Sequence, residues 1–237
     1  MRKALCLVLA PLLLVGCLVA PAPDPGETHD GVIYLETFSG APTEFLHGKQ
    51  PDQGRATWLS IITHTVPSWR ADGTLASPPS RQNRNAFLPF VPKDGRIYTL
   101  SLEVNPTSGD AAAEFFALGF AKDPSPEQIF ASRDVIMAGP WWAQAWNREH
   151  VAVSYVGPGD QGGANTPSKE GWVELKIVLN TTEEQWIAEW FYDGEKVRTH
   201  QYATNPTINY VGFGAMRFAA GAVRNFQLVG EIPAKDK

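Results

Sequence analysis

The feature that most constrains the fold is a two-residue alternation of apolar side chains. It is clearest in Trp172–Leu179, where alternate positions are apolar: Val173, Leu175, Ile177 and Leu179. The positions between them carry Trp172, Glu174, Lys176 and Val178. Because successive side chains of a strand point to opposite faces of a sheet, this segment is predicted to be a strand with one buried face.

Similar alternation, or a short apolar run between turn residues, predicts further strands along the chain. They are Val32–Phe38, Thr57–His64, Ala86–Val91, Ile97–Val104, Phe115–Ala121, Val135–Ala138, His150–Val156, Gln185–Tyr192, Glu195–Tyr202, Asn209–Met216 and Val223–Gly230. Asp193-Gly194 separates two of them and predicts a tight hairpin. About 12 short strands with turn residues between them predict an all-β fold, an antiparallel β-sandwich of the jelly-roll type.

Three segments are expected to depart from this strand pattern. Pro126–Arg133, which contains proline at its start, predicts a short helix. Trp141–Arg148 is expected to form a second helical turn. Ser68–Arg84 is predicted to be a long polar loop, and long loops within compact domains are often functional.

Composition narrows the class of protein. Of 237 residues, 43% are hydrophobic and only 19% are charged, which argues against a disordered chain and against a coiled coil. The formal net charge of −5 argues against a nucleic-acid partner, which a basic surface would hold. The length fits one sandwich domain, predicted to span residues 31–232.

The N-terminus has the layout of an export signal. Arg2 and Lys3 precede an apolar run that is too short for a membrane-spanning helix. The run ends in Leu14-Val15-Gly16-Cys17, which resembles the lipobox of bacterial lipoproteins. The resemblance implies that residues 1–16 are a signal peptide and that membrane lipid is attached to Cys17. An ordinary signal peptide, cleaved a few residues later near Ala20 or Ala22, is the alternative.

Residues 17–30 are predicted to be the lipidated cysteine and a flexible tether, because proline, glycine and polar residues dominate this segment. Residues 233–237 form a polar tail. In the lipoprotein family an Asp after the cysteine implies retention in the inner membrane. Leu18 stands at that position, so the resemblance favours the outer membrane or the cell surface.

The order of several segments resembles the laminin G-like, or concanavalin A-like, jelly-roll domains. The segments are Thr37-Phe38-Ser39-Gly40, Asp94–Leu100, Phe116–Ala121, Gly171–Ile177, Asp193-Gly194, Val211–Gly214 and Ala222–Val229. The resemblance implies a two-sheet sandwich and, in many members, binding of glycans or adhesion. Its members include lectins, glycoside hydrolases and polysaccharide lyases, so the fold alone does not select an activity.

No catalytic set is recognised. The Glu-x-Asp-x-x-Glu strand that jelly-roll hydrolases of this family carry is absent, and Glu189 and Asp193 are predicted to be solvated. No two of the five histidines stand at a metal-ligand spacing on one element. Oxygen ligands for calcium are available at Asp72, Asp94 and Asp160, although turn residues of this kind are usually structural.

Aromatic and basic residues give the candidate ligand-binding set. Trp141, Trp142 and Trp146 cluster in one segment, and exposed aromatic rings stack on the apolar faces of sugars. The polar segment Ser68–Arg84 adds Trp69, Arg70 and Arg81 as candidates for the rim of a site. The alternatives are that the tryptophans cap one end of the sandwich and that the polar segment is plain surface.

These observations predict an exported, membrane-anchored lipoprotein with a non-catalytic domain that binds a glycan or another component of the cell envelope. No cofactor is implied apart from the calcium considered above. A glycoside hydrolase or lyase with a non-standard site is one alternative, and a structural envelope protein is another.

Overall fold

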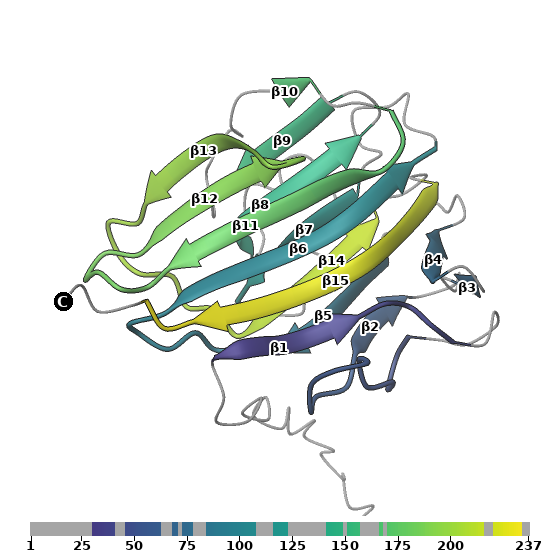
Figure 1. Ribbon diagram of the computed structural model, residues 1–237, viewed down its shortest axis with the longest axis horizontal. Coiled ribbons are helices and arrows are strands. Elements are labelled where there is room, and N and C mark those ends of the chain that lie inside the picture. Colours follow the sequence, from purple (N-terminus) through teal and green to yellow (C-terminus); the bar gives the residue numbers. More distant parts are fainter. Residues whose placement is uncertain are drawn as a thin grey trace, which may run out of the picture.

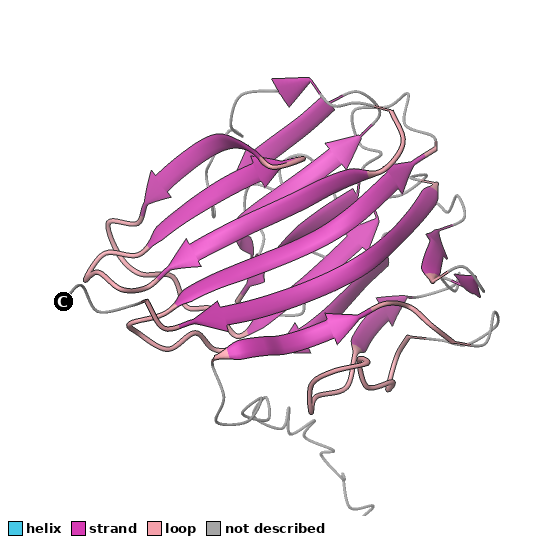
Figure 2. Cartoon of the chain, viewed as in Figure 1, coloured by secondary structure: helices cyan, strands magenta, loops and turns pink. Residues whose placement is uncertain are grey.

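The computed structural model describes residues 30–40, 46–62, 68–70, 73–77, 84–107, 116–122, 141–148, 151–156, 166–167, 170–215 and 220–233. Every secondary-structure element within these residues is a β-strand (Figure 2). They are β1 (Gly31–Glu36), β2 (Leu59–Ile62), β3 (Ser68–Arg70), β4 (Thr74–Ser77), β5 (Arg84–Pro89), β6 (Ile97–Pro106), β7 (Phe116–Ala121), β8 (Trp141–Arg148), β9 (Val151–Tyr155), β10 (Thr166–Pro167), β11 (Val173–Asn180), β12 (Ile187–Tyr192), β13 (Glu195–Gln201), β14 (Tyr210–Ala215) and β15 (Gly221–Glu231).

The strands form two antiparallel sheets. One sheet has eight strands in the order β13-β12-β11-β6-β15-β4-β3, with β1 also paired to β15. The other has seven strands in the order β10-β9-β8-β7-β14-β5-β2. In Figure 1 the eight-stranded sheet lies in front of the seven-stranded sheet, and the two make a sandwich. The predicted antiparallel jelly-roll sandwich is therefore confirmed.

The core lies between the two sheets and follows from the alternation in the sequence. In β6 and β11 every second side chain is buried and the intervening ones are partly exposed. Residues such as Leu102 and Ile177 from the eight-stranded sheet join Leu88 and Phe120 from the seven-stranded sheet in one apolar cluster. Burial of each such side chain stabilises the fold by roughly 1.5–3 kcal/mol.

The hairpin predicted at Asp193-Gly194 is confirmed. Tyr192 pairs with Glu195, so the loop between β12 and β13 has two residues. Asp193 has a φ of 49° and Gly194 a φ of 82°. Two consecutive positive φ angles are those of the type I′ turn, whose twist matches that of the flanking strands.

Two predictions about local structure are wrong. Trp141–Arg148 is not a helical turn but β8, which lies between β7 and β9 in the seven-stranded sheet. The segment predicted as one long polar loop contains β3 and β4, which pair with each other. In both cases pairing with neighbouring strands supplies the hydrogen bonds that a helix or loop would otherwise need.

Several predictions lie outside the described residues. They concern the helix Pro126–Arg133, the strand Val135–Ala138, the signal and tether over residues 1–29, and nearly all of the tail. Within the described part of the chain no helix is long and apolar enough to span a membrane.

Candidate functional site

The outer face of the seven-stranded sheet, away from the core, has a floor of very small residues. In β7 the residues Phe116, Leu118 and Phe120 belong to the core, so the residues between them lie on the outer face. The register places Ala117 opposite Gly214 of β14, and Gly119 opposite Gly212. These four residues, Ala117, Gly119, Gly212 and Gly214, are the small-residue floor.

Strand β5 borders the small-residue floor on one side. Its core residues alternate with Asn85 and Phe87, which therefore share the outer face with the floor. Asn85 is opposite Gly214, and Phe87 is opposite Gly212. A Cβ atom at Gly212 would lie only 2.7 Å from Cδ1 of Phe87 and 2.2 Å from the carbonyl oxygen of Ala86, so only glycine fits under this ring.

Strand β8 borders the floor on the other side and carries three of the predicted site residues. Its backbone pairs Trp146 with Ala117 and Trp141 with Ala121. Trp142 falls at a register shift between the two strands. The structure therefore brings Trp141, Trp142 and Trp146 together on one strand of the seven-stranded sheet, next to the small-residue floor.

The remaining predicted site residues are not brought to this strand. Trp69 and Arg70 belong to β3, at the far end of the eight-stranded sheet. Arg81 and Cys17 lie outside the described residues. Trp69 and Arg70 therefore belong to a different sheet from Trp141, Trp142 and Trp146.

Sequence reasoning missed Asn85, which lies between the predicted loop and the predicted strand. Its side chain is only 2% exposed, and neither its amide nitrogen nor its amide oxygen has a hydrogen-bond partner in the structure. The alternation of Asn85 and Phe87 with Ala86 and Leu88 was the signal that could have placed it on the outer face.

The strands of the seven-stranded sheet carry no acidic residue and no histidine over their described lengths. Their charged residues are Arg84 and Arg148. A jelly-roll hydrolase needs two carboxyl groups facing one groove, as acid and as nucleophile or base. These strands do not provide such a pair.

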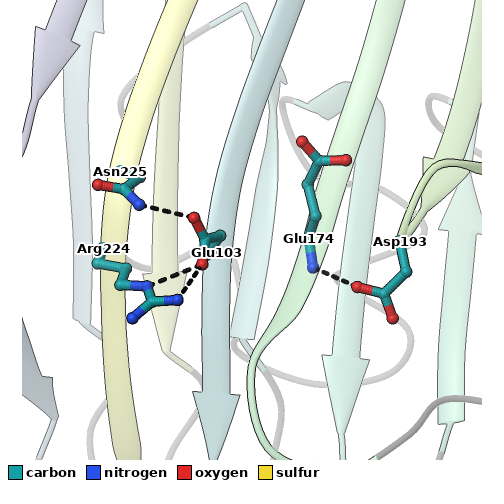
Figure 3. Close-up of polar contacts among 5 residues, drawn as sticks. All are labelled: Glu103, Glu174, Asp193, Arg224 and Asn225. Carbon is teal, nitrogen blue, oxygen red and sulfur yellow. Dashed lines mark hydrogen bonds and ion pairs between the residues drawn. The ribbon is translucent and has the colours of Figure 1, made fainter.

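The outer face of the eight-stranded sheet carries the acidic side chains instead (Figure 3). Both carboxylate oxygens of Glu103 are occupied: Oε2 accepts from Nε of Arg224 at 2.7 Å, and Oε1 accepts from the amide of Asn225 at 2.6 Å. The guanidinium of Arg224 also lies 4.1 Å from the ring centre of Trp172. This network fixes a bulge in β15, where Asn225 has a φ of 55°.

Glu174 stands opposite Glu103 on the neighbouring strand β11. Its backbone N–H donates to Oδ1 of Asp193 at 2.9 Å, as Figure 3 shows, and its carboxylate lies 3.7 Å from Nζ of Lys176. Glu189, which was predicted to be solvated, is ion-paired with Lys196 at 2.9 Å. Partners within the sheet account for these acids, and their arrangement indicates a structural role.

A buried carboxylate lies at the end of β1. Glu36 is 3% exposed, and it accepts hydrogen bonds from the backbone N–H of Phe38 at 2.6 Å and from Nε1 of Trp58 at 3.2 Å. Burial raises the pKa of Glu36 above its ordinary value, and the nearby charge of Asp52 raises it further, while the two hydrogen bonds oppose the shift.

The described residues do not include a cluster of side chains that could bind calcium. No group of three or more His, Cys, Asp or Glu side chains suited to a metal ion occurs among them. Asp94 accepts a hydrogen bond from Nε1 of Trp186 at 3.2 Å, and Asp72 and Asp160 lie outside the described residues.

Comparison with known proteins identifies the fold. No family model and no curated protein matches the sequence. Among solved structures, an endo-1,3-β-glucanase from Streptomyces sioyaensis superposes with a TM-score of 0.57 at 14% identity, over 90% of this chain and 100% of that one. The carbohydrate recognition domain of Emp47p superposes with a TM-score of 0.53 at 13% identity, over 85% of this chain and 98% of the other.

A seed lectin of Lotus tetragonolobus also superposes, with a TM-score of 0.51 at 12% identity, over 80% of this chain and 98% of the lectin. These identities are low, so the likeness is one of fold. The protein has the concanavalin A-like jelly-roll fold that is found in lectins and glucanases.

Proposed function

We propose that this protein is a lipoprotein, anchored through Cys17, whose jelly-roll domain binds a saccharide on the outer face of the seven-stranded sheet. The observation that carries the proposal is the small-residue floor, bordered on one side by the strand that holds Trp141, Trp142 and Trp146. The solved structures that share the fold include a carbohydrate recognition domain and a lectin, which is consistent with this proposal.

The physical basis of the proposal is the contrast in size between neighbouring positions. Ala117, Gly119, Gly212 and Gly214 carry little or no side chain, and all four are buried in the structure. Tryptophan on the adjacent strand can provide an apolar wall against which a pyranose ring stacks.

Binding without hydrolysis is the better reading of this face. Over their described lengths the strands of the seven-stranded sheet offer no Asp or Glu to serve as acid and nucleophile. The carboxylates of Glu103 and Glu174 belong to the other sheet, and Glu103 is held by Arg224 and Asn225. We therefore assign the domain a binding role.

A glycan array with the full-length protein in detergent tests this function. We expect a saccharide ligand, and Trp146→Ala should weaken its binding by about tenfold or more, because a stacking surface is lost. Trp172→Ala, at the residue before β11 of the eight-stranded sheet, is the control and should bind like the wild type. Absence of any saccharide ligand, or equal binding by Trp146→Ala and wild type, would contradict the proposal.

The anchor is tested separately by cell fractionation. Several acyl chains on one cysteine hold a protein firmly, since each buried methylene contributes about 0.8 kcal/mol. The Cys17→Ser variant should therefore move from the membrane fraction to the soluble extracytoplasmic fraction, whereas a Cys6→Ser variant should stay with the membrane. A Cys17→Ser protein that still fractionates with membranes like the wild type would rule out this anchor.

A further inference from the structure

Two large apolar side chains are exposed in the described part of the chain, and they lie at the same end of the sandwich. Val91 is 50% exposed and Ile232 is 52% exposed. Val91 lies in the loop that leads from β5 to β6, and Ile232 directly follows β15, whose Glu231 pairs with Ile97 at the start of β6. Single exposed apolar residues are ordinary, so it is their shared position that needs an explanation.

The loop that carries Val91 is held in place by hydrogen bonds. The side chain of Thr181 is 1% exposed, and its hydroxyl donates to the carbonyl oxygen of Lys93 at 2.8 Å and accepts from the N–H of Arg96 at 3.1 Å. The N–H of Lys93 donates to the hydroxyl of Tyr98 at 2.8 Å. The exposure of Val91 is therefore part of the folded structure, and an ordered loop loses little further entropy when it contacts a surface.

Arg96 adds a positive charge beside these apolar side chains. Because Ile97 is opposite Glu231, Arg96 and Ile232 are the next residues along the two paired strands. Nη1 of Arg96 donates to the carbonyl oxygen of Gly95 at 3.3 Å, and its Nε has no hydrogen-bond partner. A guanidinium held only by a neutral backbone group can donate to a phosphate, whose geometry suits it.

The tether joins the domain at this same end. Strand β1 begins at Gly31, which pairs with Gly230 near the end of β15. Figure 1 shows the start of β1, the start of β6 and the end of β15 together at one end of the sandwich. The segment from Cys17 to Asp30 spans about 45 Å at most when fully extended, so a lipid on Cys17 keeps this end near the membrane.

We infer that the end of the sandwich that carries Val91, Arg96 and Ile232 docks on the phospholipid surface in which Cys17 is anchored, an inference that depends on the anchor proposed above. The two apolar side chains enter the boundary between headgroups and acyl chains, as the apolar side chains of other interfacial segments do. The guanidinium of Arg96 pairs with a lipid phosphate.

The other charges at this end determine which interaction dominates. Lys93 is exposed here, and so are several acidic residues: Asp30, Asp94, Glu183, Glu184 and Glu231. These acids offset the attraction that the basic residues have for anionic lipid. Contact with the membrane is therefore expected to depend mainly on Val91 and Ile232.

The test places an environment-sensitive fluorophore on single cysteines introduced into the lipidated protein, in vesicles of phosphatidylethanolamine and phosphatidylglycerol. Val91→Cys and Ile232→Cys report on the proposed contact. Thr107→Cys is the matched control, because Thr107 is also exposed but follows β6 at the opposite end of the sandwich. In the proposed anchor the thiol of Cys17 carries lipid, so the introduced cysteine alone takes the label.

Nitroxide-labelled lipid should quench the fluorophore at positions 91 and 232, and its emission there should be about twofold or more above that in the soluble Cys17→Ser protein. Position 107 should show neither effect. Adding Val91→Ser and Arg96→Ala to the Ile232→Cys protein should reduce the quenching by about twofold or more, because the apolar contact and the phosphate contact are lost.

The outcomes separate the inference from the anchor. No quenching at positions 91 and 232, equal quenching at all three positions, or quenching that the two added substitutions leave unchanged would overturn the inference and leave the anchor standing. If the thiol label attaches to the protein without an introduced cysteine, Cys17 carries no lipid, and the anchor fails together with the inference.

Discussion

At the scale of single residues, Asn85 and Glu36 are two buried polar side chains that differ in their hydrogen bonding. The carboxylate of Glu36 has two donors, the backbone of Phe38 and the indole of Trp58, whereas the amide of Asn85 has none. A satisfied group contributes to the fold, while an unsatisfied one costs roughly 1–3 kcal/mol. The hydrogen bonds of Glu36 therefore indicate a structural role for its carboxyl group.

Glu36 gives the protein a predictable pH dependence. Because its folded pKa is raised above the ordinary 4.5, the folded state binds more protons than the unfolded state between pH 4.5 and the raised value. The stability that wild type derives from this site should therefore fall as pH rises through that window. As pH rises through this window, the melting temperature of wild type should fall relative to that of Glu36→Gln.

The exposed Glu195→Gln variant is the control for the general effect of removing one negative charge. Subtracting its shift from that of Glu36→Gln isolates the buried carboxyl group. A difference between Glu36→Gln and wild type that stays constant across the window would show that Glu36 ionises alike in the folded and unfolded states.

At the scale of elements, the sequence predicted strands wherever the alternation was strict. Trp172–Leu179 was placed as a half-buried strand and corresponds to β11, whose burial alternates at each residue. Asp193-Gly194 was placed as a hairpin because so few residues tolerate two positive φ angles. Here local chemistry and the final fold agree, so local reasoning is sufficient.

Strand β8 shows where local reasoning fails. Its sequence, with Ala143 and Ala145 between larger residues, is compatible with a helical turn. Pairing with β7 and β9 on its two sides makes it an inner strand, and the sequence of the segment does not contain that information. The segment that holds the three tryptophans can be recognised in the sequence, but the small-residue floor cannot, because it forms only when β7 and β14 pair.

At the scale of the whole molecule, the two outer faces differ in chemistry. The eight-stranded sheet carries ion pairs such as Arg224–Glu103 and Lys196–Glu189, so these charged side chains have partners within the sheet. The seven-stranded sheet carries the small-residue floor and no acidic residue along its described strands. Under the proposed function, the face of the seven-stranded sheet is the one expected to bind the saccharide.

Hydrogen–deuterium exchange of the full-length protein, with and without the best saccharide from the array, tests this central claim most directly. We expect protection on binding in β5, β7, β8 and β14, because ligand contact slows local opening of those strands. Exchange in β11, β12 and β13 of the other sheet should not change. Protection confined to the eight-stranded sheet would contradict the account.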